Sequence, residues 1–243
     1  MPESSASGAR RFDADPPVAL TGRGFARGVV RALPVALSTI AFGMVLGVLA
    51  RRAGLSVLEV GLMSGLAFTG SGQLVAIRMW ETPLPDVAIV STTLLLGLRH
   101  VLMGLTLQPW FSHLRPAVGH GSYFLLTDES WGLCTVEFQS RPTDAAFLIG
   151  AGSVLYTSWV TSTALGSVAG GSIPDPSAWG LDFALAGVFI SLLVSLVRGS
   201  AVFVEWCLAA AVAIAADRWL PGNWYVLLGA TAGSLPALLR ARP

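Results

Sequence analysis

Long apolar segments with few charges are the feature that most limits what this chain can fold into. A helix needs about 20 mostly apolar residues to cross the hydrocarbon core of a bilayer. Several segments approach that length, and short turns rich in Pro, Gly or Arg separate them. They cover residues 28–50, 57–78, 85–111, 121–138, 145–170, 181–197, 200–216 and 224–240. The sequence therefore predicts an all-α polytopic membrane protein, a bundle of seven or eight transmembrane helices.

The composition agrees with a membrane location. Hydrophobic residues make up 53% of the chain and charged residues only 12%, whereas a soluble domain is about a quarter charged. No stripe of basic residues marks a nucleic-acid surface. The two cysteines match neither a disulfide framework nor a metal site. We therefore expect a lipid bilayer around the protein, and no nucleic acid, metal or cofactor among its ligands.

The first two dozen residues differ from the rest of the chain. They contain Ser, Gly, Pro, Asp and Arg without an apolar run, whereas a signal peptide has a basic start followed directly by an apolar stretch. We predict that residues 1–24 form a disordered cytoplasmic arm and that residues 25–243 form a transmembrane transporter domain. The Arg residues near the predicted span ends favour both termini inside the cell.

The second apolar segment is interrupted near its middle by Phe68-Thr69-Gly70-Ser71-Gly72-Gln73. Glycines on both sides of Ser71 predict a broken helix near Gly70–Gly72. Broken helices at membrane depth occur only where they are buried in protein or line water, and the N–H groups that begin a half-helix can hold a substrate carboxylate. Gly70, Ser71 and Gln73 are therefore candidate substrate-binding residues. A close helix crossing that requires glycine is the alternative.

Arg99 and His100 lie well inside the third apolar segment. A charge at mid-bilayer costs about 2.5–3.5 kcal/mol on insertion scales, so it pairs with another charge or faces a polar cavity. Arg99 therefore either holds a substrate carboxylate through its planar guanidinium or forms a structural ion pair with Asp128 or Glu129. His100 either titrates near neutral pH as a proton carrier or is a hydrogen-bonded packing residue. We assign both residues to the candidate substrate site.

Asp128 and Glu129 are adjacent acids in the fourth segment, the weakest predicted span because it carries three acidic residues. They point about 100° apart on a helix, so one can face the core while the other does not. A buried carboxyl group there is a candidate for proton coupling. The alternative is that Thr127 and Asp128 begin a helix, because Thr, Asp and Glu are favoured in a first turn. Ser56-x-x-Glu59 likewise predicts a capping box that begins the second segment.

Small residues predict helix contacts and indicate a repeat. Gly43/Gly47 and Gly166/Gly170 are GxxxG pairs, which let two helix backbones touch. The first and fifth segments each end in such a pair, and a small-residue span follows each. This pattern indicates two related halves offset by about 120 residues. Halves with an odd number of spans would be inverted, as in many transporters.

Several short motifs occur in a fixed order from about Gly24 onward. They are Ala32-Leu33-Pro34, Phe42-Gly43, Phe68-x-Gly70-x-x-Gln73, Leu98-Arg99-His100, Leu126-Thr127-Asp128-Glu129, Tyr156-x-x-Trp159 and Asp182-Phe183-Ala184. In their order and spacing these motifs resemble the AzlC family of azaleucine-resistance proteins, the large subunits of branched-chain amino acid exporters. One departure is Gly97, where the resemblance leads us to expect a polar Asn.

The resemblance implies a multi-pass secondary transporter of the bacterial inner (plasma) membrane that exports branched-chain or other hydrophobic amino acids, and not an enzyme. It also implies a small membrane partner subunit of the AzlD type. Proton coupling is our inference from the buried carboxylates. A channel or an intramembrane enzyme acting on a small zwitterionic or anionic substrate is the alternative. Against an enzyme, the chain has no HExxH motif, and against a channel it shows no repeated filter motif. Because the chain lacks lysine it has no Walker A motif, so it hydrolyses no ATP by that route.

Overall fold

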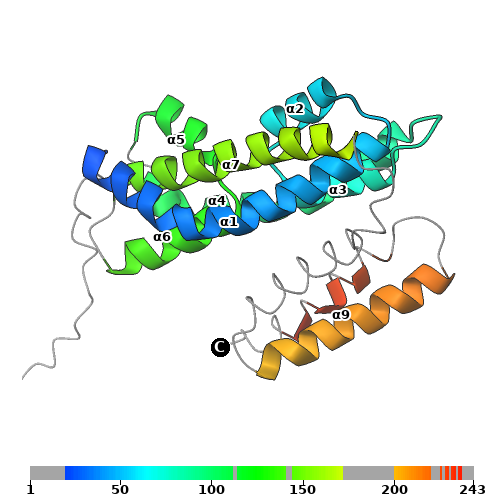
Figure 1. The fold of residues 1–243 in the computed structure, drawn as a ribbon. Helices are drawn as coiled ribbons and strands as arrows, with labels where there is room; N and C mark the ends of the chain where they lie inside the picture. The colour runs from blue at the N-terminus through cyan, green and yellow to red at the C-terminus, as the bar shows by residue number, and fades with distance from the viewer. Residues whose placement is uncertain are drawn as a thin grey trace, which may run out of the picture. The chain divides into compact units, whose positions relative to one another are not determined.

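The structure of the protein is a computed structural model. It describes residues 20–111, 114–140, 144–171 and 200–219, with residues 225, 228–229, 231–233 and 235–236. Every regular element in these residues is a helix (Figure 1), which confirms the predicted all-α class. Most of the predicted N-terminal arm, the predicted span 181–197 and parts of the predicted span 224–240 lie outside the described residues.

The chain divides into two compact units, Met1–Pro176 and Ser177–Pro243. Three long helices run through the larger unit: α1 (Gly22–Arg52), α4 (Asp86–Phe111) and α7 (Ala146–Gly170). Helix α1 therefore begins two residues before the predicted end of the arm. Among the described residues, α1 and α4 are long and apolar enough to cross a membrane. Each of the three helices ends 59 residues after the previous one.

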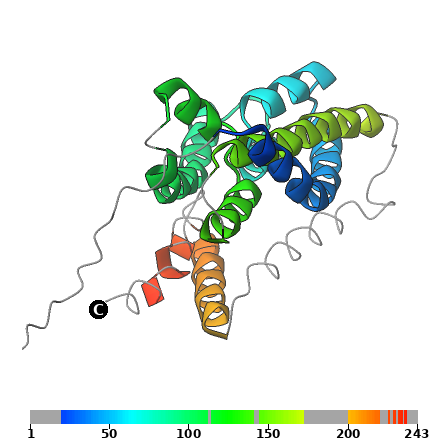
Figure 2. The ribbon, with the colours of Figure 1, turned by 90° about the vertical axis from the view of Figure 1, so that its left-hand side faces the viewer.

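Helices α1 and α7 lie side by side and parallel (Figures 1 and 2). We call the end of the larger unit where both begin the N-terminal end, and the end where both finish the opposite end. At four positions a glycine of one helix faces a backbone carbonyl of the other so closely that even a Cβ atom would clash. These contacts, which include members of both predicted GxxxG pairs, let the two backbones touch. They pair Gly28 with Phe147, Gly150 with Phe25, Gly47 with Thr163 and Gly166 with Met44.

The second predicted span folds as a hairpin of two short helices, which we call the first hairpin. Helix α2 (Val57–Leu66) starts just after α1 and runs inward until it lies beside Tyr156, near the middle of α7. Helix α3 (Gly70–Arg78) then turns back along α2. The hydrogen bond from the Gln73 side chain to the Met63 carbonyl of α2 shows this reversal. A straight helix would separate these two residues by about 15 Å. The first hairpin therefore enters from the opposite end and returns to it.

The fourth predicted span is also a hairpin, the second hairpin, and it enters from the N-terminal end. Helix α5 (Pro116–Tyr123) runs back along α4, where its last residue lies beside Gly104. Helix α6 (Asp128–Ser140) then runs in the direction of α4, and the ring of Phe138 packs near the end of α4, with its centroid 6.4 Å from that of Phe111. The tips of the two hairpins therefore approach the middle of the larger unit from opposite ends.

These hairpins do not confirm the predicted seven or eight crossings. The sequence predicts residues 57–78 and 121–138 as crossings, but residues 57–78 reverse near their middle, and residues 121–138 contain the end of α5, a turn at residues 124–127 and most of α6. Hydropathy measures the length of apolar chain and not its direction, and each half-helix of about ten residues is about 15 Å long, half of a bilayer core. The broken helix predicted near Gly70–Gly72 is confirmed, with the break at residues 67–69 and the two glycines in the first turn of α3. The break at residues 124–127 corrects the single helix predicted over residues 121–138 and agrees with the alternative in which Thr127 and Asp128 begin a helix.

An ion-pair cluster joins three helices at the N-terminal end. Arg27 Nε of α1 lies 3.0 Å from Glu137 Oε1 of α6, and Arg27 Nη2 lies 3.8 Å from Asp144 Oδ2. Asp144 also accepts hydrogen bonds from Thr21 and from the N–H of Ala146, which begins α7. Glu137 and Asp144 are only 7% and 5% exposed, so the cluster fixes the starts of α1 and α7 against the end of α6.

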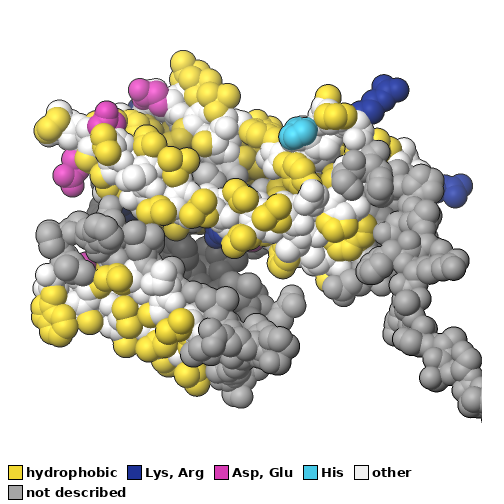
Figure 3. Space-filling view, turned by 180° about the vertical axis from the view of Figure 1, so that it is seen from behind, with side chains coloured by type: hydrophobic (Ala, Val, Ile, Leu, Met, Phe, Trp, Pro, Cys, Tyr) yellow, Lys and Arg dark blue, Asp and Glu magenta, His cyan; other side chains and the backbone are white. Residues whose placement is uncertain are grey.

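The surface of the larger unit is largely apolar between its ends. On the face in Figure 3, most charged side chains of the described residues gather toward the two ends. Helix α4 exposes a row of leucines, Leu94, Leu98, Leu102 and Leu105. In the smaller unit, α9 (Ser200–Trp219) covers the predicted segment 200–216. A large apolar exterior of this kind suits a lipid environment.

Candidate functional site

The tips of the two hairpins converge on the side chain of Arg99, which lies near the middle of α4. Arg99 Nη2 donates a hydrogen bond of 2.8 Å to Ser71 Oγ, in the first turn of α3. Arg99 Nη1 lies 3.0 Å from Asp128 Oδ2, in the first residue of α6. One guanidinium therefore connects a crossing helix with the starts of two half-helices. The sequence analysis proposed all three residues, and the structure brings them together.

The start of α6 is closed by a reciprocal pair of hydrogen bonds. The N–H of Ser130 donates to Thr127 Oγ1 at 3.3 Å, and the N–H of Thr127 donates to Ser130 Oγ at 2.8 Å. This arrangement is a capping box with Ser130 at the position that Glu often takes. The two alternatives for Asp128 are therefore compatible, since it lies in the first turn of a capped helix and also pairs with Arg99. Glu129 is half-buried beside it.

The start of α3 is open in comparison. Its N-cap residue, Thr69, makes no hydrogen bond from its side chain to the first turn. A Cβ atom at Gly70 would lie 2.8 Å from a ring carbon of Phe42 and 3.1 Å from one of Trp159, so a larger residue would push this turn away. The first N–H groups of a helix have no partner within it and carry partial positive charge, which suits a carboxylate.

The buried side chain of Gln73 makes hydrogen bonds to other parts of the protein. Its amide nitrogen donates to the Met63 carbonyl at 2.9 Å and to the Ala67 carbonyl at 2.6 Å, and its amide oxygen accepts from Trp159 Nε1 at 3.2 Å. The residue is 2% exposed. Gln73 thus closes the carbonyl end of α2 and ties the first hairpin to α7. A role for it in binding substrate remains a prediction, as does one for the half-buried His100 next to Arg99.

Tyr156 of α7 contacts both tips. Its hydroxyl donates to the Gly65 carbonyl of α2 at 2.9 Å. Its ring packs edge-on against Phe68 in the first tip and Phe124 in the second, with centroids 5.3 and 5.6 Å apart. In the sequence, Tyr156-x-x-Trp159 stands out as a motif, but neither residue could be given a role from it. The signal available was two aromatic residues with polar groups, one helical turn apart, in a span rich in small residues.

Chemically, the site combines one fixed cation with groups that can exchange around it. Arg99 can bind a carboxylate through two hydrogen bonds, and the open start of α3 offers N–H groups beside it. Asp128 balances the charge of Arg99 in the present structure. Among the described residues no group of three or more His, Cys, Asp or Glu side chains could hold a metal ion. The geometry therefore suits reversible binding of a small anion or zwitterion.

Comparison with known proteins decides the family. The family model described as AzlC protein matches residues 34–173, which include most of α1, both hairpins, α4 and α7. The chain belongs to the AzlC family. This confirms the resemblance in the sequence motifs, and Arg99, Ser71 and Asp128 all lie within the matched part.

The relatives of this AzlC chain are membrane proteins. A membrane protein of Archaeoglobus fulgidus, described as uncharacterized, is 30% identical over 177 residues, which are 72% of this chain and 77% of the relative. The inner membrane protein YgaZ of Escherichia coli is 28% identical over 225 residues, 89% of this chain and 91% of the relative. No solved structure matches the chain.

Proposed function

We propose that this chain is the large subunit of a secondary transporter that exports branched-chain or other hydrophobic amino acids across the inner membrane, coupled to protons. The observation that carries the proposal is the convergence of two hairpin tips, which enter from opposite ends, on Arg99. Two of the long helices have the length and hydropathy of membrane spans. Sites of this kind, where broken helices meet at mid-depth, are typical of secondary transporters.

The substrate carboxylate competes with Asp128 for Arg99. In the structure one guanidinium holds both Ser71 Oγ and Asp128 Oδ2. An arriving carboxylate takes the place of Asp128 on the guanidinium and is also held by the N–H groups that begin α3. The side chains of both partners of the existing pair are partly accessible, 42% for Arg99 and 52% for Asp128, so the pair itself is not locked by burial.

Displacement of Asp128 couples substrate to protons. Once Asp128 loses Arg99 it is a carboxylate without its counter-charge at the tip of the second hairpin. Taking up a proton removes that charge, and releasing it restores the pair with Arg99 when the substrate leaves. Glu129, half-buried in the same turn, is the second residue we assign to this proton step.

The hairpins give the site access to each side in turn. The first hairpin covers the site from the opposite end and the second from the N-terminal end, so opening either one exposes Arg99 to one side only. A small membrane subunit of the AzlD type completes the transporter in this proposal. The apolar row on α4, from Leu94 to Leu102, is available for lipid or for such a subunit.

The test is efflux from cells loaded with labelled leucine, with and without a small partner subunit. Arg99→Ala and Asp128→Asn should each abolish efflux at normal membrane levels. Arg78→Ala and Asp86→Asn are matched controls, because Arg78 ends α3 and Asp86 is, like Asp128, the first residue of a helix. If wild type shows no efflux even with the partner, the substrate class is wrong. If the site variants export normally, the assignment to Arg99 and Asp128 is wrong.

Counterflow separates a transporter from the alternative of a channel. Vesicles preloaded with unlabelled leucine should transiently accumulate labelled leucine above its external concentration, because a carrier exchanges one substrate for another across its alternating site. Asp128→Asn should retain this exchange while losing proton-driven uptake, since the variant cannot release a proton. If labelled leucine inside the vesicles never exceeds its external concentration, the result would instead favour a channel.

A further inference from the structure

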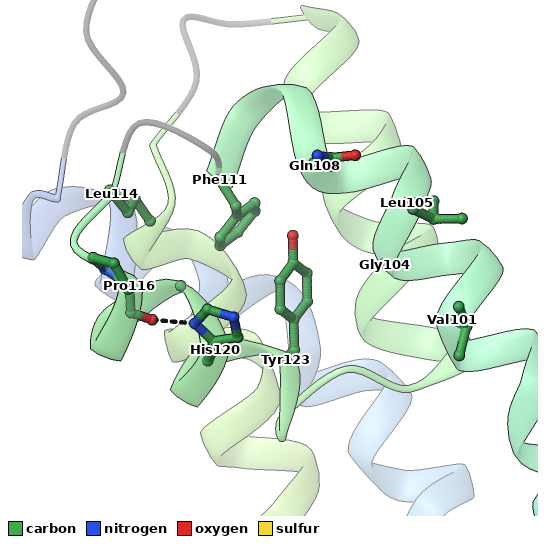
Figure 4. A pocket seen from close by; sticks show the side chains of 10 residues that line it. Val101, Gly104, Leu105, Gln108, Phe111, Leu114, Pro116, His120 and Tyr123 are labelled. Atoms are coloured by element: carbon green, nitrogen blue, oxygen red, sulfur yellow. Dashed lines mark hydrogen bonds between the residues drawn. The ribbon is translucent and has the colours of Figure 1, made fainter.

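A pocket outside the Arg99 site lies between α4 and α5, inside the second hairpin. Its volume is about 410 Å³, within the range of pockets that bind small molecules, roughly 300–1,000 Å³. Its outer part is formed where α4 ends and α5 begins, at Phe111, Leu114 and Pro116, which is the N-terminal end (Figure 4). Its inner part reaches Val101 and Tyr123, two residues from Arg99 and four from Thr127.

The lining of this pocket combines apolar walls with a few uncharged polar groups. Val101, Leu105 and Phe111 provide much of the wall. Gln108 offers an amide that both donates and accepts, and Tyr123 offers a hydroxyl that does the same. Apart from His120, no residue of the lining is ionisable near neutral pH, so the pocket favours a molecule without net charge.

His120 is oriented by a local hydrogen bond. Its Nδ1 lies 2.6 Å from the Pro116 carbonyl oxygen, and because a carbonyl can only accept, Nδ1 carries the hydrogen. In the neutral ring the other nitrogen, Nε2, is then an acceptor, and it lies on the side of the ring that faces Tyr123 (Figure 4). An ammonium group has the hydrogen-bond donors that this acceptor and the Gln108 carbonyl require.

We propose that this pocket is the port through which the amino acid passes between the Arg99 site and the aqueous face at the N-terminal end, and that it holds the zwitterion there as a waiting site. The apolar walls receive the side chain, and the groups of Gln108, His120 and Tyr123 receive the ammonium and carboxylate. The inference rests on the proposed transport function, whose Arg99 site it does not share.

Thiol labelling tests whether the pocket is open to water. In a Cys207→Ser background, Leu105→Cys places a thiol on the pocket wall, and Leu102→Cys places one on the same helix outside the lining, where Leu102 is similarly exposed. Cys134 is fully buried. A charged, membrane-impermeant methanethiosulfonate should modify the thiol at 105 and not the one at 102, and only from the membrane face that carries an N-terminal tag. If the thiols at positions 105 and 102 are both labelled negligibly, the pocket faces lipid and not water, and the proposal is overturned.

Protection by substrate tests whether the pocket binds the amino acid. Leucine at a concentration that fills nine pockets in ten should slow labelling at position 105 about tenfold, also in an Arg99→Ala background where the central site is disabled. Labelling that leucine does not slow in that background would overturn the waiting site. This readout needs no transport, so it separates failure of the port from failure of the proposed function.

A blocking substitution tests whether the pocket lies on the transport path. A Cβ atom at Gly104 would lie 3.8 Å from a ring carbon of Tyr123, and one at Gly121 on the same hairpin would meet nothing within 4 Å. Gly104→Trp should therefore fill the pocket and reduce leucine efflux more than tenfold, while Gly121→Trp, at equal membrane level, retains it. If wild type exports leucine and Gly104→Trp exports it equally well, the pocket is not the port.

Discussion

The two hairpins have similar lengths and opposite directions, but different kinds of bonds hold their tips. The first hairpin is joined to α7 and to itself by neutral hydrogen bonds of Gln73, Trp159 and Tyr156, and Gln73 is 2% exposed. The second is joined to α4 by the exposed ion pair between Arg99 and Asp128 at its tip and, one turn along α6, by a hydrogen bond from Trp131 Nε1 to Thr106 Oγ1. A charged substrate can compete with the second kind of bond and not with the first. The difference indicates that the first hairpin is a fixed part of the framework and the second is the part that responds to substrate.

The largest effect on folding should come from breaking the anchor of the first hairpin. Gln73→Leu leaves two backbone carbonyls and the Trp159 indole N–H without partners, which should cost about 2–4 kcal/mol. Thermal unfolding of the detergent-purified protein measures it. Gln108→Leu, on the exposed face of α4, is the control and should leave the midpoint nearly unchanged. Equal midpoints for Gln73→Leu and wild type would show that this anchor does not hold the hairpin.

A smaller effect is expected from Tyr156→Phe. The substitution removes the hydrogen bond to the Gly65 carbonyl and keeps the ring that packs against Phe68 and Phe124. It should cost about 1 kcal/mol, and Tyr156→Leu should cost more because it also removes the ring contacts. The same melting experiment ranks the three proteins. If Tyr156→Phe is as unstable as Tyr156→Leu, the ring contacts contribute nothing and the hydroxyl hydrogen bond accounts for the whole effect.

The caps of the two half-helices provide a matched pair of threonines. Thr127→Ala removes a side chain that accepts from the first turn of α6 and should cost about 1 kcal/mol. Thr69→Ala changes an N-cap that makes no such bond, so the midpoint should stay at the wild-type value. Hydrogen exchange of the two helix starts provides a local measure. A loss at Thr69 as large as that at Thr127 would contradict an open start of α3.

The smallest effect on stability should come from the ion pair. Asp128→Asn removes a pair whose two side chains are 42% and 52% exposed, and such pairs contribute about 0.5 kcal/mol or less when screened by solvent. The melting midpoint should therefore barely move, although efflux is lost. A strong destabilisation by Asp128→Asn would place the second hairpin in the fixed framework and remove the contrast between the hairpins.

Much of the site could be predicted from local sequence. The break before Gly70 follows from its flanking glycines, and the capping box of Ser56 and Glu59 forms as predicted. Arg99 could be expected to pair because an isolated charge among leucines is costly. That Asp128 and not Glu129 is the partner depends on the direction in which α6 runs beside α4. Thr127 and Asp128 signal the start of that helix, but no local pattern indicates its direction.

The direction of the short helices could not be predicted. Two half-helices joined by a tight turn contain as many apolar residues as one span, so residues 57–78 look like a crossing. Residues 121–138 look like one because the end of α5, the turn and α6 form one continuous, mostly apolar segment. The long-range bonds that reveal the reversal, such as Gln73 to Met63, exist only in the folded chain. Asp144 was missed for a related reason. An acid just before an apolar run is an ordinary helix start, and its bonds to Thr21 and Arg27 span more than a hundred residues.

The glycine contacts between α1 and α7 also bear on how the chain is inserted into a membrane. Helix α7 is as long as a span but rich in Ser, Thr and Gly, and among the described helices only α1 and α4 have the hydropathy of a span. Its close backbone contact with α1 supplies packing that lipid would not. If both helices cross the membrane as proposed, we expect α7 to enter the bilayer against α1, which is synthesised more than ninety residues earlier.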